Sequence, residues 1–465
     1  MSVRNRMVLS AVTAGVVMAL LAGCAVSGGG GAPSSNPASS QGSSDPNNPF
    51  GVSASAPLEV VIFKGGFGDD YAKYVESLYT KAFPGATITH NGVQKIQDVL
   101  QPRFVAGNPP DVVDNSGPAA LNLATLQQSG QLMDLQQLLD APSVDDPSIT
   151  VGASLLPGGA GDLGNSIVAI NYAYTVYGFW YNQDLFAQHG WTYPQTWDEL
   201  LALCAKMKAA GIAPFTYQGK YPSYFVDPLM QMIGKAGGMQ AVLDIDNLTP
   251  NAWRAQPVVD SVNAIEQLVT NGYILPGSEG LSHTESQQAW IDGEAALIPC
   301  GSWLENEMKS TLPSGFRMAV GATPSVTAHD VLPAGAIEAS ASESFIVPKD
   351  GKNAAGGQEF LRQMLSKAAA SKFSELTGSL TTVKGAGADV TNSPGLTSSR
   401  TAVAAAGDNI VNFRFAGWYG DMYNTISTAM GELLAGRITA ADFIDRAQAA
   451  ADKTASDPDV VKYHR

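Results

Sequence analysis

Short apolar segments alternate with amphipathic segments along most of this chain, and this alternation constrains the fold more than any other feature. Residues 58–63 have the pattern of a first strand, followed by a helix over 71–83 and a strand over 86–89. A helix over 96–105 and a strand over 111–113 continue the series. Strands that alternate with helices in this way are typical of parallel α/β units. The sequence therefore predicts an α/β fold.

A second α/β series follows Ser166, with apolar strands expected over 167–170 and 176–181. Thr196 and Glu199 then form a capping box that begins a helix. The same signature is expected over 284–287, ahead of the helix that carries Trp290, and a strand is expected over 344–347. Later helices are expected over 353–365, 368–376 and 418–434, and from 440 onward.

The beginning of the chain has the features of a secretion signal. Arg4 and Arg6 precede an apolar run that is too short for a comfortable membrane span. The run ends in Leu21-Ala22-Gly23-Cys24, where small residues leave room for a lipoprotein signal peptidase. We therefore expect residues 1–23 to be a lipoprotein signal peptide and Cys24 to be lipidated. An ordinary signal peptide with an incidental cysteine is the alternative.

Residues 24–56 are mostly Gly, Ser, Ala, Pro and Asn, a composition typical of a flexible tether. No later segment is long and apolar enough to span a bilayer. We therefore expect an extracytoplasmic protein that a lipid anchor holds at the outer face of the cell membrane.

The charge and the cysteines narrow the class of protein further. The formal net charge is −15, and an acidic surface repels nucleic acid. Besides Cys24 the chain has Cys204 and Cys300, which allow one disulfide. Cys204 shares an apolar helical stripe with Leu200 and Met207, so two buried free thiols are favoured over a bridge.

The loop Gly65-Gly66-Phe67-Gly68 resembles the start of a dinucleotide fingerprint, because it follows the first strand. It lacks the third glycine, and Asp69 and Asp70 would place negative charge against a pyrophosphate. The same backbone amides and carboxylates suit the hydroxyl groups of a polyol.

Catalytic and metal-binding motifs are missing from the sequence. There is no phosphate-binding loop, no nucleophile elbow and no pair of histidines with metal-ligand spacing. We expect no catalytic residue, no metal and no cofactor. A glycoside hydrolase stays open as an alternative, because its two acids can be distant in sequence.

Aromatic residues stand at the ends of several predicted elements. Such rings can stack on the apolar face of a sugar while nearby polar groups bond its edge. Core packing is the ordinary role for most of them. Trp303 and Trp418 are the better candidates for ligand contacts, because each lies at a turn into a helix. The aromatic residues concerned are Phe67, Tyr217, Tyr221, Tyr224, Trp303, Trp418 and Tyr419.

The stretch from Trp290 to Ile298, closed by Gly301-Ser302-Trp303, resembles the segment that carries a sugar-stacking tryptophan in maltose-binding-type solute-binding proteins. Further segments in the same order resemble that family over nearly the whole mature chain. They lie at residues 109–117, 177–182, 221–225 and 417–419.

A closer resemblance is to the N-acetylglucosamine- and diacetylchitobiose-binding lipoproteins of actinobacterial importers. Relatives often have Asn where this chain has Cys300. The segments that carry this resemblance lie at residues 65–70, 108–117, 212–224, 245–253, 301–308 and 406–419.

The resemblance implies a two-lobed periplasmic-binding-protein-like fold, with hinge crossings near residues 174–178, 343–347 and 400. The N-terminal lobe would comprise 57–174 plus 345–400, and the C-terminal lobe 175–344 plus 401–465. The ligand-binding residues implied at the cleft between them are Gly66, Phe67, Asp114, Asn115, Tyr224, Trp303, Glu343 and Trp418.

The function that these features imply is that of the substrate-binding subunit of an ABC importer, not an enzyme. It would bind a sugar of the N-acetylglucosamine or chitobiose class and deliver it to the permease subunits. Its expected partners are thus the sugar ligand, the permease and the membrane through its lipid anchor, and not nucleic acid. A membrane-anchored glycoside hydrolase and an adhesive or scaffolding surface lipoprotein are the alternatives.

Overall fold

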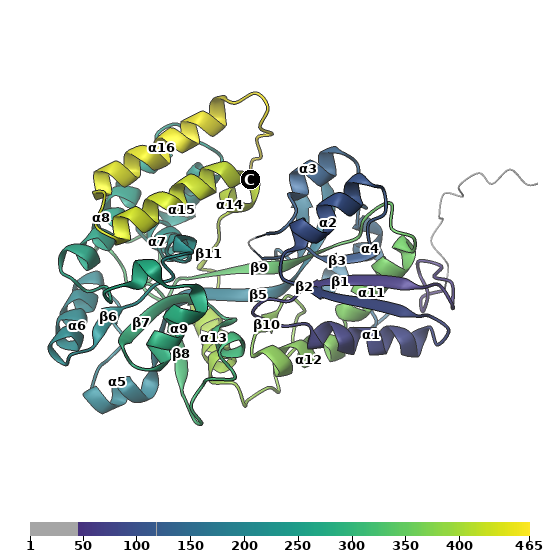
Figure 1. Ribbon diagram of the computed structural model, residues 1–465, viewed down its shortest axis with the longest axis horizontal. Coiled ribbons are helices and arrows are strands. Elements are labelled where there is room, and N and C mark those ends of the chain that lie inside the picture. Colours follow the sequence, from purple (N-terminus) through teal and green to yellow (C-terminus); the bar gives the residue numbers. More distant parts are fainter. Residues whose placement is uncertain (1–44, 118) are drawn as a thin grey trace, which may run out of the picture. The chain divides into compact units, whose positions relative to one another are not determined.

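The computed structural model describes residues 45–117 and 119–465. Within these residues, eleven strands form one mixed sheet whose main path runs in the order β2-β1-β3-β9-β5-β7-β6 (Figure 1). The α/β class is therefore confirmed. The predicted signal peptide, Cys24 and the first part of the tether lie outside the described residues.

One end of the sheet contains the first predicted series. Strands β1 (Leu58–Phe63), β2 (Ile88–Val93) and β3 (Val112–Asp114) are parallel, with β1 in the middle. Helices α1 (Asp70–Ala82) and α2 (Ile96–Val105) connect them. The predicted first strand and the helix over 96–105 are confirmed to the residue, because each pattern ends at a clear loop signal.

The other end of the sheet contains the parallel strands β6 (Ala213–Phe215) and β7 (Ala295–Gly301). Helix α6 (Trp197–Ala209) begins with the predicted capping box of Thr196 and Glu199. The second capping box was placed two residues too late. The cap of α9 (His283–Ile291) is Ser282, whose hydroxyl accepts from the Glu285 N–H while the Glu285 carboxylate accepts from the Ser282 N–H.

Two long antiparallel strands, β5 (Ser166–Asn182) and β9 (Ile337–Ile346), join these ends. The sequence predicted two strands where β5 is one, because residues 171–175 look polar. Tyr172 and Thr175 are nevertheless fully buried, and the pairing with β9 continues through them. Strand β5 contributes to two hydrophobic cores, with Tyr172 in one and Phe179 in the other, and these cores define the two lobes.

The first lobe is built around a core that includes Val60, Tyr71, Tyr172 and Phe345. The second lobe is built around a core that includes Phe179, Phe225, Trp253 and Met430. Figure 1 shows the yellow C-terminal helices on the second lobe, far from the purple strand β1 of the first lobe. This arrangement agrees with the predicted two-lobed fold.

The remaining elements complete the two lobes. The predicted helix over 418–434 is two helices, because the chain bends between Trp418 and Gly420. In chain order the remaining elements are α3 (Leu123–Gln128), α4 (Gln136–Asp140), η1 (Gly152–Ser154), β4 (Ala160–Leu163), α5 (Gln183–His189), η2 (Pro222–Phe225), α7 (Val226–Asp246), η3 (Ala252–Arg254), α8 (Gln256–Thr270), η4 (Ser278–Gly280), α10 (Leu304–Glu307), β8 (Met318–Gly321), α11 (Ala354–Met364), α12 (Lys367–Thr377), β10 (Leu380–Thr381), α13 (Pro394–Ala406), β11 (Ile410–Val411), α14 (Phe415–Trp418), α15 (Gly420–Leu434) and α16 (Ala440–Ser456).

Two of the predicted boundaries differ from the structure. The tether was expected to extend to residue 56, but Phe50 and Val52 are buried in the core of the first lobe. The side chain of Asn48 accepts a hydrogen bond from the Val52 N–H at 2.7 Å, which fixes this segment. The boundary at residue 400 falls inside α13, and this helix packs against β8 of the second lobe.

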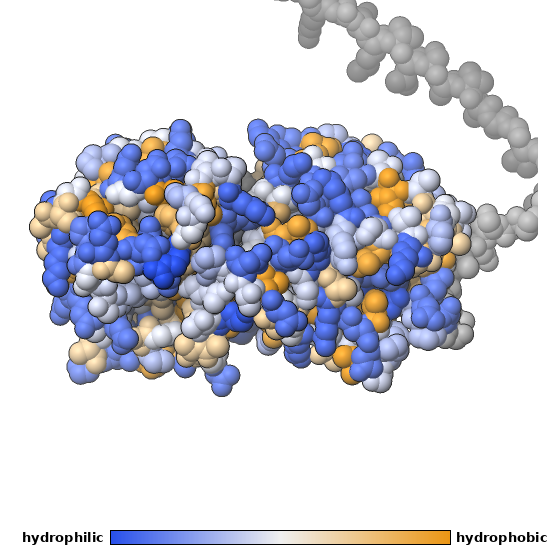
Figure 2. Space-filling view, turned by 90° about the horizontal axis from the view of Figure 1, so that it is seen from below, coloured by the Kyte–Doolittle hydropathy of each residue, from blue (hydrophilic) through white to orange (hydrophobic). Residues whose placement is uncertain are grey.

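The surface and the cysteines have ordinary features. Hydrophilic residues cover most of the face shown in Figure 2, and hydrophobic residues are scattered over it in small groups. None of the helices in the described part of the chain combines the length and the apolar character that a membrane span needs.

Cys204 and Cys300 are both buried free thiols, which confirms the prediction that they form no bridge.

Candidate functional site

The parallel strands β1 and β3 end at the same edge of the sheet, and the loops after them carry predicted site residues. The ring of Phe63 lies so close to Gly65 and Gly117 that a Cβ would meet it at 2.2 Å on the first and 2.4 Å on the second. Both loops therefore need glycine at these positions. Loops at the carboxyl ends of parallel strands are where open α/β sheets bind ligands.

Asp114 ends β3 and is fully buried. Its Oδ2 accepts a hydrogen bond from the Tyr71 hydroxyl at 2.9 Å, and its Oδ1 accepts one from the Ser116 hydroxyl at 2.6 Å. Burial is the main influence on this carboxyl and raises its pKa to about 7, although the two hydrogen bonds act in the opposite direction. Near neutral pH, Asp114 can therefore be either a donor or an acceptor.

Glu343, on β9, lies beside Asp114 and forms what we term the first acidic pair with it. Burial raises the pKa of Glu343 well above its usual value, and the charge of Asp114 raises it further. The backbone of Glu343 has a φ of 55°, a left-handed conformation that costs energy for a residue with a side chain. Its side chain is half-buried. Carboxyls with strained backbone and a raised pKa cluster at functional sites.

Two other predicted site residues have clear structural partners. Phe67 is buried in the first lobe, where its ring meets that of Phe373 at 5.2 Å between centroids. The amide of Asn115 donates to the Leu121 carbonyl at 3.0 Å and accepts from the Leu121 N–H at 2.8 Å. Both residues shape the loops at this edge, and their ligand contacts remain predictions.

The two acidic residues after the glycine-rich loop were expected to bond sugar hydroxyls, but their carboxylates pair with basic side chains instead. Asp69 is 5% exposed and forms ion pairs with Lys64 at 3.1 Å and Lys73 at 2.8 Å, with His90 at 3.3 Å. Asp70 also pairs with Lys73, at 2.8 Å. Both carboxylates therefore stabilise the start of α1.

Trp303 follows β7 in the second lobe, and its ring folds back over Gly301, where a Cβ would lie 2.1 Å from it. The ring makes edge contacts with Tyr177 at 5.6 Å and Tyr224 at 5.8 Å between centroids. A Cβ on Gly66 of the first lobe would lie 3.2 Å from the Trp303 Cβ. The structure thus brings together Gly66, Tyr177, Tyr224 and Trp303, which we term the Trp303 cluster.

A hydrogen bond supports this contact between the lobes. The side-chain amide of Asn306, on α10, donates to the Gly66 carbonyl at 2.6 Å. The edge of the second lobe at β7 and α10 therefore meets the glycine-rich loop of the first lobe. A ligand held by the Trp303 cluster would touch both lobes.

Trp418 lies at the end of α14, and its ring contacts are separate from those of the Trp303 cluster. Its ring is half-buried and meets those of Tyr419 at 6.1 Å and Tyr463 at 5.5 Å between centroids. None of its described ring contacts involves Trp303. Its role in binding therefore remains a prediction.

Four residues near the Trp303 cluster were missed or given no binding role by the sequence analysis: Tyr177, Asp227, Glu338 and Tyr423. Tyr177 is paired with Glu338 across strands β5 and β9. Burial is the main cause that raises the pKa of the Tyr177 hydroxyl well above its usual value, and the charges of Asp227 and Glu338 add to it. Glu338 is a charged residue in a strand of small and apolar residues, and that contrast could have marked it.

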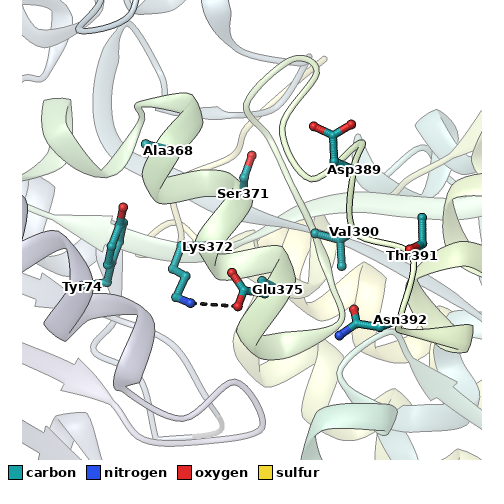
Figure 3. Close-up of a pocket in the computed structure, with 9 residues that line it drawn as sticks. All are labelled: Tyr74, Ala368, Ser371, Lys372, Glu375, Asp389, Val390, Thr391 and Asn392. Atoms are coloured by element: carbon teal, nitrogen blue, oxygen red, sulfur yellow. Dashed lines mark hydrogen bonds and ion pairs between the residues drawn. The ribbon is translucent and has the colours of Figure 1, made fainter.

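A separate surface depression, shown in Figure 3, lies between α1, α12 and the loop at residues 389–392. Lys372 and Glu375 form an ion pair across part of it at 2.9 Å. No predicted site residue lines it. Its lining residues are Tyr74, Ala368, Ser371, Lys372, Glu375, Asp389, Val390, Thr391 and Asn392.

Comparison with known proteins places this geometry in a family. Residues 64–371 match the model of the bacterial extracellular solute-binding protein family. The diacetylchitobiose binding protein NgcE of Streptomyces coelicolor is 36% identical over 428 residues, which cover 91% of this chain and 90% of that protein.

Solved structures show the same fold. A chitin oligosaccharide binding protein superposes with a TM-score of 0.69 and 21% identity, covering 86% of this chain and 99% of the other. RafE from Streptococcus pneumoniae superposes with a TM-score of 0.67 and 21% identity, covering 87% of this chain and 99% of the other. The two-lobed architecture, the family match and the extent of the identity lead to one conclusion: the chain belongs to the bacterial extracellular solute-binding protein family.

Proposed function

We propose that this protein is the substrate-binding subunit of an ABC importer and that it binds a sugar of the N-acetylglucosamine or chitobiose class. The observation that carries the proposal is the 36% identity to a diacetylchitobiose binding protein over nearly the full length of both chains. The Trp303 cluster supports it, because flat aromatic rings beside buried polar groups suit a pyranose.

The ligand would sit between the lobes, in contact with the loops after β1 and β3 on one side and the loop after β7 on the other. A ligand that touches both lobes stabilises the closed form, which the permease would then recognise. The division of the chain at residues 174 and 344 is part of this proposal. So is the set Gly66, Phe67, Asp114, Asn115, Tyr224, Trp303, Glu343 and Trp418 as ligand-binding residues.

Calorimetric titration of the full-length protein tests the function. We expect N-acetylglucosamine or chitobiose to bind with saturable heat, and maltose and raffinose to bind more weakly or not at all. We also expect no monosaccharide to be released when the protein is incubated with chitobiose, because we propose a carrier and not a hydrolase. Released N-acetylglucosamine would show an enzyme, and an absence of heat with every sugar would refute sugar binding.

We propose further that the mature protein begins at Cys24 and is anchored by lipid to the outer face of the cell membrane. The support is the lipobox that ends in Cys24 and the polar segment after it. The variant Cys24→Ala is expected to lose incorporation of a fatty-acid probe completely, because the thiol is the site of attachment. Cys204→Ala is the matched control and should be labelled like the parent. Labelling of Cys24→Ala at the parental level would contradict the anchor.

A further inference from the structure

Glu338 is a buried carboxyl that nothing in the fold fully satisfies. It is 2% exposed, and its Oε2 has no hydrogen-bond partner among the described residues. It stands opposite Tyr177 in the pairing of β5 with β9, and Tyr177 is a member of the Trp303 cluster. A buried acceptor without a partner destabilises the fold, so the presence of Glu338 here calls for an explanation.

Asp227, in the first turn of α7, approaches Glu338 and Tyr177 from this helix. Gln231 lies one helical turn further along, and its side-chain amide donates to the Tyr177 carbonyl at 3.3 Å. Residues four apart lie on the same face of a helix, so Asp227 faces the paired residues Tyr177 and Glu338. We term Asp227 and Glu338 the second acidic pair.

The groups around this pair are hydroxyls and one thiol. Tyr177 faces it from β5, Tyr423 from α15, Tyr224 from η2 and Cys300 from β7. Neither Asp227 nor Glu338 forms an ion pair with a basic side chain in the described part of the chain. Glu338 is buried and Asp227 is half-buried. Ionising both carboxyls at neutral pH without a cation is unfavourable, because each loses solvent and the two charges repel each other.

The ionisation of the pair agrees with this geometry. Burial raises the pKa of Asp227 to about 8. Burial, followed by the charge of Asp227, raises the pKa of Glu338 well above its usual value. At neutral pH the pair therefore holds at least one proton, and its hydroxyl form can donate while the other oxygen atoms accept.

We propose that Asp227 and Glu338 form a protonated subsite that binds the uncharged hydroxyl or amide groups of the sugar beside the Trp303 cluster. The inference rests on the proposed function and deepens it by naming the chemistry of recognition. The carboxylic O–H donates to a sugar oxygen, and the free Oε2 of Glu338 accepts from a sugar O–H or N–H. A neutral ligand is favoured because it leaves the shared proton in place.

The proposal predicts a loss of sugar affinity at alkaline pH. When the pH rises through about 8, Asp227 of the unliganded pair loses its proton and the binding-competent fraction falls. The apparent dissociation constant rises in inverse proportion to that fraction, so affinity for chitobiose at pH 9 is expected to be about tenfold weaker than at pH 7. Calorimetric titration of the full-length protein from pH 6 to pH 9.5 measures this change.

The double variant Asp227→Asn with Glu338→Gln should abolish the pH dependence. Its two amides keep donors and acceptors at every pH, and no titrating group of the pair remains. We expect its affinity at pH 7 to stay within about tenfold of the parent, since one neutral hydrogen bond contributes about 1 kcal/mol. Glu294→Gln, the same change on an exposed side chain, is the control and should keep the parental pH profile.

Each outcome decides a different point. If the parent binds chitobiose and the double variant retains the tenfold alkaline loss, the function holds and the subsite is wrong. If the parent binds equally at pH 7 and pH 9, the protonated subsite is likewise refuted. If the deacetylated glucosamine disaccharide binds more tightly than chitobiose and loses that advantage in the double variant, the pair is a site for an ammonium group instead. If the parent binds no sugar at any pH, the proposed function fails and the subsite with it.

Discussion

Replacing Trp303 with alanine is expected to weaken chitobiose binding about thirtyfold or more. The Trp303 ring stands between Tyr177, Tyr224 and the Gly66 loop, so its loss removes the central aromatic surface of the proposed site. Truncation of a buried aromatic anchor costs about 2 kcal/mol or more in binding, and each ~1.4 kcal/mol is about tenfold in affinity. Calorimetric titration against the parent measures the change.

A purely structural role for Trp303 gives a different result. It predicts a large fall in thermal stability, with near-normal affinity in the protein that remains folded. Trp191→Ala is a matched control, because Trp191 packs on Phe186 and His189 away from the proposed site. If Trp303→Ala and Trp418→Ala both bind within about twofold of the parent, the proposed site is misplaced.

Removing the carboxylate of Glu359 is expected to destabilise the protein by about 3–5 kcal/mol, because it leaves a buried guanidinium without its partner. The side chains of Glu359 and Arg362 are 0% and 4% exposed, and Arg362 Nε lies 2.7 Å from Glu359 Oε2. Arg362 also donates to the carbonyls of Pro142 at 3.1 Å and Asn47 at 3.3 Å. Urea unfolding of Glu359→Ala, followed by tryptophan fluorescence, measures the loss.

The double variant Glu359→Leu with Arg362→Met provides the comparison. Replacing both members of a buried ion pair by apolar residues of similar size is often neutral, so the double variant should be more stable than Glu359→Ala. If Glu359→Ala unfolds within about 1 kcal/mol of the parent, the buried ion pair does not stabilise the protein as we expect.

Local signals in the sequence were sufficient for elements whose boundaries depend on near neighbours. The capping box at Thr196 is an example, because a hydroxyl and a carboxylate three residues apart determine it. Signals that depend on distant partners were insufficient. The segment around Phe50 looked like a tether because its composition is polar, yet Phe50 is buried in a core that also contains residues as distant in sequence as Phe360 and Phe373.

The candidate site shows the same division. Trp303 and Tyr224 could be chosen from their places at element ends, and the structure brings them together at 5.8 Å between centroids. Asp69 looked available for a ligand, but Lys64 and Lys73 reach it from both sides. The partnership of Glu338 with Asp227 could not be predicted, because their proximity arises only when α7 packs on the strands.

The passage of β5 and β9 through both lobes limits how relatives of this protein can exchange parts. The core of the first lobe combines Val60 and Tyr172 with Phe345 and Phe373, and the chain between Tyr172 and Phe345 builds most of the second lobe. A single genetic crossover between residues 183 and 336 would therefore join halves of two different first-lobe cores. New ligand preferences in such a chain must arise by substitution within the loops, or by two crossovers that exchange a whole lobe at once.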